Sequence, residues 1–163
     1  MEQNSSLAIR EANAEDAPLI LKMIKELAVY EDMLDCVQAT EEIVYDSLFV
    51  RKKANALIVE YDSRAIGYVI YFYNFSTFTG KPGLYVEDIY IIPEMRKNGF
   101  GKYIFRYLAD IAQRENCARM EWACLDWNES SIRFYKGMGA IDMNEWTVYR
   151  LDEKALVQLT ESN

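Results

Sequence analysis

One short segment combines glycines with basic residues in a way that suits an anionic ligand. It reads Arg96-Lys-Asn-Gly-Phe-Gly-Lys102 and joins an apolar run to a stretch with helical spacing. Gly99 and Gly101 permit positive φ and a close approach of the backbone to a ligand. The first N–H groups of the following helix lack partners within it, and such a helix start binds phosphate. The alternative is a surface loop whose glycines serve turn geometry alone.

Two adjacent carboxylates, Glu87 and Asp88, interrupt the apolar run before this turn. Because side chains alternate along a strand, the two are predicted to point to opposite faces of a sheet. A buried face holds a carboxylate only at a cost, so at least one of them is expected to line a cleft. The alternative is an edge-strand salt bridge or a solvated strand end.

A third segment, residues 125–139, predicts a strand end, a turn and a helix closed by a glycine. Asn128 is expected to cap this helix or to donate to a ligand. Tyr135 shares a helical face with Ile132 and Met138, a pattern more typical of core packing than of catalysis.

The chain has no histidine, and its three cysteines lack a CxxC spacing. This excludes zinc sites that contain histidine and nucleophiles that a histidine activates. The cysteines, Cys36, Cys117 and Cys124, are predicted to be inert buried thiols, with a cysteine activated by a neighbour other than histidine as the alternative, and no metal is expected.

The chain has 163 residues, which suits one compact domain over residues 1–163. Its net charge of −8 disfavours nucleic acid and anionic membranes and attracts cations, although solubility alone also explains it. The first residues lack a basic region followed by an apolar stretch, and no apolar run has membrane-spanning length. A cytoplasmic protein is therefore predicted.

The spacing of apolar residues predicts the elements that must position these groups. Strands are expected at 7–10, 56–60, 66–74, 84–91, 120–125 and 146–151. Helices are expected after a capping pair at Asn13 and Asp16, from Thr40 through Leu48, over 99–116 and 129–138, and after Asp152. Residues 68–73 should lie centrally, because an exposed run so rich in β-forming residues aggregates. The order predicts an α/β fold, a mixed sheet with helices on its faces.

The segment Arg96–Gly101 matches the Arg/Gln-x-x-Gly-x-Gly/Ala acetyl-CoA motif of the GNAT superfamily, and the predicted element order resembles that fold. The chain is also similar to the spermidine/spermine (diamine) acetyltransferase family, including its thialysine acetyltransferase branch. The segments that carry this similarity are Ile24-Lys-Glu-Leu-Ala-Val-Tyr-Glu31, Leu84-Tyr-Val-Glu-Asp-Ile-Tyr90, Asp126-Trp-Asn128, Phe134-Tyr-Lys136 and Gly139-Ala140. The resemblance covers nearly the whole chain.

The resemblance implies an acetyl-CoA-dependent N-acetyltransferase that acts on a small cationic amine, a polyamine or diamine such as spermidine or spermine. It implies that the pyrophosphate is held by Arg96, Lys97, Asn98, Gly99, Phe100, Gly101 and Lys102. It places the pantetheine on the main chain of Ile89, Tyr90 and Ile91, and further cofactor contacts at Asn128, Glu129, Ser130 and Ser131. It assigns Tyr135 as general acid and Glu87 as general base, and it implies that the amine is bound by Tyr30, Glu31, Glu87, Asp88 and Glu145.

Amide formation needs groups of these types. An alkylammonium, with a pKa of about 10, must lose a proton before it attacks the thioester, and a carboxylate such as Glu87 accepts that proton directly or through water. The departing thiolate can take a proton from a phenol such as Tyr135. Because the chain has no histidine to pair with a cysteine, direct transfer in a ternary complex is expected rather than an acetyl-enzyme.

Two segments depart from the polyamine enzymes. Ser76-Thr-Phe78 stands where those enzymes have an acidic residue and a tryptophan, and the region of Asn144–Trp146 is shorter. A thialysine or lysine-like amino-acid acetyltransferase is therefore the alternative. A non-catalytic acyl-CoA-binding regulator and a protein-modifying enzyme are further alternatives. The family is usually dimeric, so a homodimer is expected.

Overall fold

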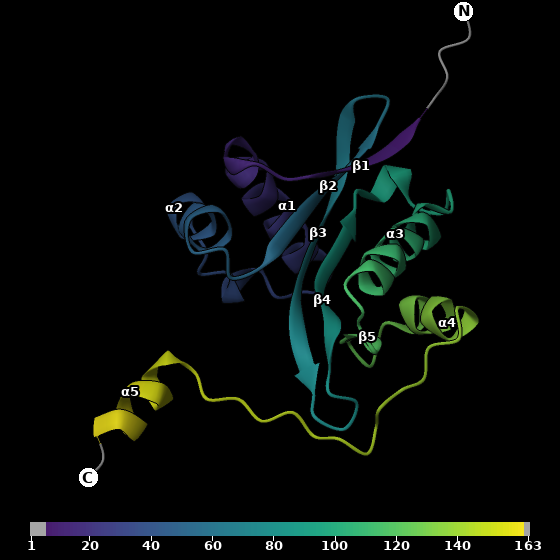
Figure 1. Ribbon diagram of the computed structural model, residues 1–163. Coiled ribbons are helices and arrows are strands. Elements are labelled where there is room, and N and C mark those ends of the chain that lie inside the picture. The colour runs from purple at the N-terminus through teal and green to yellow at the C-terminus, as the bar shows by residue number, and fades with distance from the viewer. Residues whose placement is uncertain (1–5, 162–163) are drawn as a thin grey trace, which may run out of the picture. The chain divides into compact units, whose positions relative to one another are not determined.

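The computed structural model describes residues 6–161, and the chain divides after Ala123 into two compact units (Figure 1).

The first unit contains one mixed sheet of five strands. They are β1 (Leu7–Glu11), β2 (Asn55–Tyr61), β3 (Arg64–Ser76), β4 (Lys81–Ile91) and β5 (Arg119–Trp122). They lie side by side in this order, antiparallel from β1 to β4, whereas β4 and β5 are parallel. The predicted mixed sheet is confirmed. Residues 68–71 lie centrally as predicted, because β3 is the middle strand and these residues pair with both β2 and β4, whereas Phe72 and Tyr73 lie beyond the pairing with β2.

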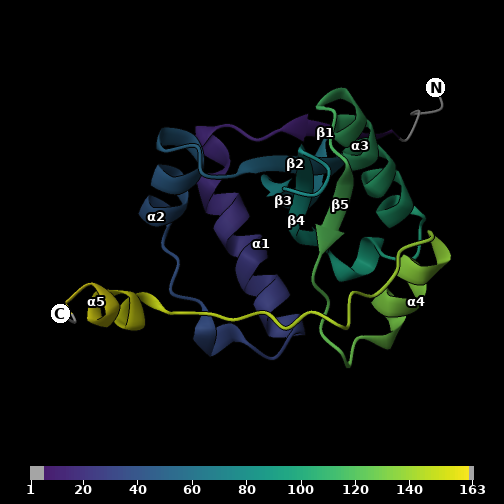
Figure 2. The ribbon, with the colours of Figure 1, turned by 60° about the horizontal axis from the view of Figure 1, so that its bottom comes forward.

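Helices cover both faces of this sheet. α1 (Ala17–Tyr30) and α2 (Glu41–Tyr45), which continues as a π-helical turn over Asp46–Val50, lie on one face, and α3 (Phe100–Arg114) lies on the other (Figure 2). Apolar residues at helical spacing turn inward from both faces, and the core includes Ile20, Met23, Ile104, Leu108 and Ile111. Among the described residues no helix is both long and apolar enough to cross a membrane.

A β-bulge interrupts the pairing of β3 with β4. Ile70 lies opposite Asp88 and Tyr71 opposite Val86, so Glu87 is the extra residue of the bulge. Residues paired across strands share a face, so Asp88 lies on the face of Ile70 rather than on that of Val86. The strict alternation assumed from the sequence therefore does not continue through Glu87. Consequently Asp88 lies on the face that α1 covers.

The second unit contains α4 (Glu129–Gly137) and α5 (Glu153–Glu161). Asp152 caps α5 as predicted, since the backbone N–H of Ala155 donates to its Oδ1 at 2.8 Å. The strand predicted at 146–151 is wrong, because the described residues between the two helices form no strand. The segment is rich in β-forming residues, but a strand forms only where a neighbour accepts and donates its backbone hydrogen bonds.

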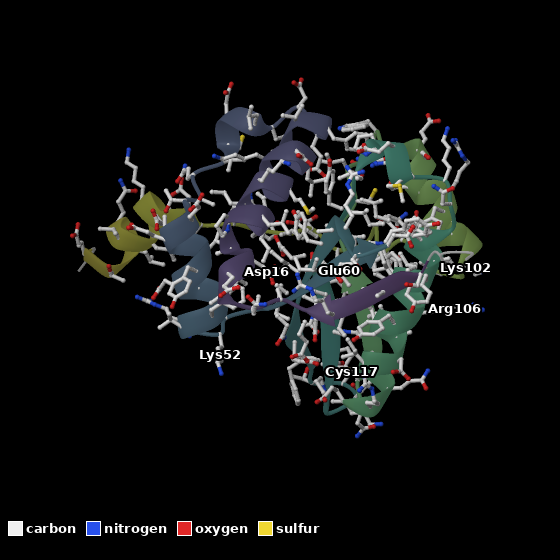
Figure 3. The ribbon with its side chains drawn as sticks, turned by 90° about the horizontal axis from the view of Figure 1, so that it is seen from above. Asp16, Lys52, Glu60, Lys102, Arg106 and Cys117 are labelled. Carbon is white, nitrogen blue, oxygen red and sulfur yellow. The ribbon has the colours of Figure 1, made fainter. Side chains whose placement is uncertain are left out.

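An ion-pair network fastens β1 to the start of α1. Arg10 contacts Asp16 at 2.7 Å and Glu60 of β2 at 2.8 Å (Figure 3). Asp16 is buried, and it also accepts from the backbone N–H of Asn13 at 2.8 Å, which confirms the predicted capping pair. The hydrogen bonds from Arg10 lower the pKa of Asp16.

We predict that Arg10→Ala lowers the free energy of unfolding by about 2 kcal/mol at pH 7, because it leaves Asp16 buried without its cation. The pKa of Asp16 is lowered in the folded state, so this contribution is present at neutral pH and is lost as the pH falls through the folded pKa. Urea unfolding at pH 7 and pH 3 measures both effects. The control is Arg64→Ala, which removes an exposed pair with Glu94 and should cost under about 1 kcal/mol. Equal losses in the two variants would contradict this role of Arg10.

Candidate active site

The parallel strands β4 and β5 separate just before Glu87 and Asp88. β5 pairs with β4 from Gly83 to Val86 and ends at Trp122, whereas β4 continues for five residues to Ile91. Along these five residues β4 has β3 on one edge and, in the described part of the chain, no strand on the other. An extended ligand can hydrogen-bond to the backbone groups of this edge in the way that an added β-strand does.

Backbone directions decide which groups on this edge are open. The carbonyl of Tyr90 lies against Gly67 of β3, which has no Cβ to obstruct it, and the N–H of Ile92 donates to Ile66 at 2.9 Å. Backbone groups of successive strand residues point to alternate edges. Tyr90 therefore directs its backbone to β3, while Ile89 and Ile91 direct theirs to the open edge. Of the three residues predicted to hold pantetheine, these two suit the role.

The turn after β4 has the backbone conformation that the glycine motif predicts. Lys97 and Gly99 have φ values of 65° and 80°, and α3 begins directly after Gly99. The side-chain amide of Asn98 donates to the carbonyls of Met95 at 3.1 Å and Arg96 at 3.3 Å, so it braces the turn itself. Figure 3 shows Lys102 on α3 beside this turn. Uncommitted N–H groups and nearby positive charge fit a pyrophosphate.

Arg96 links this turn to the end of α1. Its Nε donates to the carbonyl of Ile91 at 2.8 Å, and its guanidinium carbon lies 4.7 Å from the ring centroid of Tyr30 and 5.6 Å from that of Tyr90. Tyr90 in turn donates its hydroxyl to Glu26 at 3.0 Å. The side chain thus holds the turn against two aromatic rings through cation–π contacts.

Two carboxylates come together between α1 and the sheet. Glu31 is the C-cap residue of α1. Burial raises the pKa of Glu31 most, and the charge of Asp88 raises it further. Burial also raises the pKa of Asp88, and the hydroxyl of Tyr68, which donates to its Oδ2 at 2.9 Å, opposes that rise. The first unit therefore brings together Tyr30, Glu31 and Asp88, three of the residues predicted to bind the amine.

Glu87, the extra residue of the bulge, is exposed, whereas Asp88 is half-buried. Burial of Tyr85 raises the pKa of that tyrosine, and the charge of Glu87 raises it further. An exposed carboxylate on the strand that carries the open edge can pass a proton to water. Its role as general base stays a prediction.

The remaining predicted residues belong to the second unit. Asn128 caps α4 as predicted, accepting from the backbone N–H of Ser131 at 3.3 Å, and Glu129 pairs with Arg133 at 3.4 Å. Tyr135 is half-buried on α4, with its ring 5.6 Å from that of Phe134. Ser130 and Glu145 are exposed. The roles of these residues toward cofactor and amine stay predictions.

Sequence reasoning missed Tyr68 and Glu26. In the sequence Tyr68 stands in a run of β-forming residues, and Glu26 lies on a helix face with the spacing of ordinary surface charge. The bulge provides the missing signal, because it turns Asp88 and Tyr90 toward the face on which Tyr68 lies.

Comparison with known proteins identifies the family of this chain. Residues 21–140 match the acetyltransferase (GNAT) family, and the chain belongs to this family. It is 35% identical over 167 aligned residues to the thialysine N-epsilon-acetyltransferase of Sus scrofa, covering 95% of this chain and 98% of that protein. It is 31% identical to spermidine/spermine N(1)-acetyltransferase-like protein 1 of Homo sapiens, covering 93% of this chain but 23% of that protein.

The fold has a close match among solved structures. An integron cassette protein from the mobile metagenome of V. cholerae superimposes with a TM-score of 0.80 at 22% identity, covering 96% of this chain and 99% of that one. Family, relatives and fold together make this protein an acetyl-CoA-dependent N-acetyltransferase.

We predict that Gly99→Val weakens acetyl-CoA binding at least tenfold, about 1.4 kcal/mol, because a β-branched residue resists the positive φ and crowds the pyrophosphate turn. Calorimetric titration with acetyl-CoA measures the loss. Gly80→Val is the matched control, since Gly80 also has positive φ, 66°, but lies in the loop between β3 and β4. Strain alone would affect the thermal stability of both variants, whereas only Gly99→Val should lose affinity. Normal affinity in Gly99→Val would remove the turn from the cofactor site.

Proposed function

We propose that the acetyl acceptor is the terminal primary amine of a small cationic amino acid of the thialysine or lysine type, with polyamines and diamines as the second candidate. The observation that carries this proposal is the carboxylate pair of Glu31 and Asp88, half-buried at the end of α1. Two acidic groups in a poorly solvated place favour a compact cation. The thialysine acetyltransferase relative, aligned over nearly its whole length, supports the first candidate, and the human spermidine/spermine acetyltransferase-like relative supports the second.

In the proposed reaction the open edge of β4 holds the pantetheine, and the start of α3 holds the pyrophosphate. Glu87, directly or through water, accepts the proton of the ammonium, which leaves a neutral amine. The amine nitrogen attacks the thioester carbon, and the tetrahedral intermediate collapses as the carbon–sulfur bond breaks. The attacking nitrogen loses its second proton to solvent, the thiolate takes a proton from Tyr135, and the tyrosinate is reprotonated from solvent. The products are the N-acetylated amine and free coenzyme A.

We further propose that both units form one acetyltransferase domain, that this domain is cytoplasmic, and that it forms a homodimer. The family match, which runs across the unit boundary, supports the single domain. The segment between α4 and α5 supports the dimer, because it has no secondary structure but exposes Ile141, Trp146, Val148 and Tyr149. Exposed apolar side chains gathered in one segment are typical of an interface.

The proposed acceptor is tested by acetyl-CoA turnover, read as thiol release, with thialysine, lysine, spermidine, putrescine, diaminopropane and a basic peptide. We expect the highest kcat/KM for thialysine or lysine and a lower value for the peptide. A preference for spermidine or a diamine would establish the second candidate. If acetyl-CoA bound but no amine supported thiol release, the proposal would fail in favour of a non-catalytic acyl-CoA-binding protein.

We predict that Tyr135→Phe lowers kcat at least tenfold, about 1.4 kcal/mol in activation free energy, while the affinity for acetyl-CoA stays the same. The reason is that phenylalanine keeps the ring but has no proton for the thiolate. Steady-state kinetics and acetyl-CoA titration of the same preparation measure the two quantities. Tyr149→Phe, which alters a tyrosine that is 91% exposed, is the control and should leave both unchanged. An undiminished kcat in Tyr135→Phe would rule out Tyr135 as the acid.

A further inference from the structure

Tyr68 has the properties of a residue fixed for one contact. Its side chain is fully buried, 0% exposed, on the middle strand of the sheet. Its hydroxyl reaches the edge of the core and donates to Asp88 at 2.9 Å. The ring packs beside that of Tyr90, with 6.2 Å between ring centroids, so the hydroxyl is held in place. Neither the general acid nor the general base of the proposed reaction uses this tyrosine.

We infer that Tyr68 is a positioning residue for amine recognition. Its hydroxyl fixes Asp88 as the carboxylate that receives the cationic group of the substrate, and it leaves Glu31 as the member of the pair that takes up a proton. This inference rests on the proposed function, in that Asp88 and Glu31 are taken to face the amine.

The carboxylates of Asp88 and Glu31 lie in unequal surroundings. Two nearby carboxylates with little water around them do not both ionise at low cost, and a hydrogen bond to one of them stabilises its charged form. Asp88 receives such a bond from Tyr68, whereas the causes that shift Glu31 are burial and the charge of Asp88. The bond from Tyr68 therefore favours the charged form of Asp88, and we expect Asp88 to be the anion of the pair and Glu31 to be the first to protonate as the pH falls.

Other ionisable groups lie near Asp88 and Glu31. Besides Tyr68 on β3 and Glu31 at the end of α1, the nearby ionisable groups lie around Tyr90. They are Glu26 on α1, Glu94 after β4, and Arg96, which lies over the Tyr90 ring. Glu87 is the chain neighbour of Asp88 in the bulge. The single cation in this set, Arg96, contacts the rings of Tyr30 and Tyr90 and the carbonyl of Ile91. Tyr68 is thus the group with a defined bond that distinguishes Asp88 from Glu31.

The bond from Tyr68 also fixes the orientation of the Asp88 carboxylate. A carboxylate that keeps one oxygen bonded to a buried, immobile hydroxyl presents the other in a fixed direction. Such preorganisation lowers the entropy that an incoming ammonium must remove from its partner. Loss of the hydroxyl should therefore weaken amine binding even where the charge on Asp88 remains.

The test compares Tyr68→Phe with wild type. We expect the KM for the preferred amine to rise about tenfold, the KM for acetyl-CoA to stay unchanged, and the acid limb of the pH profile of kcat/KM to move to higher pH. Tyr71→Phe is the matched control, because Tyr71 is a buried tyrosine of the same strand whose hydroxyl interacts with Tyr73 on the opposite face. It should leave the pH profile unchanged. A Tyr68→Phe enzyme with an unshifted profile and an unchanged amine KM would overturn the inference.

A second measurement does not depend on turnover. Carbon NMR of the side-chain carboxyl groups follows the titration of Asp88 and Glu31 in wild type and in Tyr68→Phe. We expect Glu31 to protonate at higher pH than Asp88 in wild type, and the pKa of Asp88 to rise in the variant. The reverse order in wild type would overturn the inference even if the amine panel supported the proposed function. If the panel showed no use of cationic amines while the NMR order was as expected, the proposed function alone would fail.

Discussion

The arrangement of this site depends on one extra residue in a strand. The bulge at Glu87 shifts β4 by one position against β3, so that Asp88 and Tyr90 lie on the face covered by α1. Without the bulge, Asp88 would share a face with Val86 and would point into the apolar core on the side of α3. A lone carboxylate there would lack the hydroxyl of Tyr68 and would carry the full cost of burial. The bulge therefore makes two adjacent carboxylates compatible with a central strand.

In the proposed reaction the same strand contacts both the cofactor and the amine. Its edge is open beyond Val86 because β5 ends there, and its α1 face carries Asp88, whose charge acts on Glu31 at the end of α1. The edge supplies backbone donors and an acceptor, which suit an uncharged extended chain, and the turn that follows supplies positive charge. An overall charge of −8 is thus distributed unevenly, with basic residues gathered at the anion-binding turn and carboxylates at the end of α1. Local charge, rather than net charge, matches each proposed ligand.

What the sequence predicts well is local. The helix after Gly99 was predictable because glycine, basic residues and apolar periodicity occur within one short stretch, and the Asn13 and Asp16 capping box because its spacing is fixed. The bulge was not predictable, because strict alternation is the only rule that a strand sequence offers and the register is decided by the partner strand. The strand predicted at 146–151 was wrong for a related reason, since β-forming residues favour an extended backbone but do not supply a neighbouring strand to pair with. Long-range pairing thus accounts for both departures.

Arg96 shows how a motif residue can have a structural task beyond ligand charge. Its side chain bonds the carbonyl of Ile91 and stacks on Tyr30 and Tyr90, so it ties the anion-binding turn to the helix end that carries Glu31. Because Arg96 occupies the carbonyl of Ile91, the groups that remain on the open edge of β4 are the N–H groups of Ile89 and Ile91 and the carbonyl of Ile89. A shift of the turn on cofactor binding would act on Tyr30 and hence on the neighbouring carboxylate pair. One guanidinium therefore contacts both the turn proposed for the pyrophosphate and the helix end proposed for the amine, and an alanine at this position would remove both contacts at once.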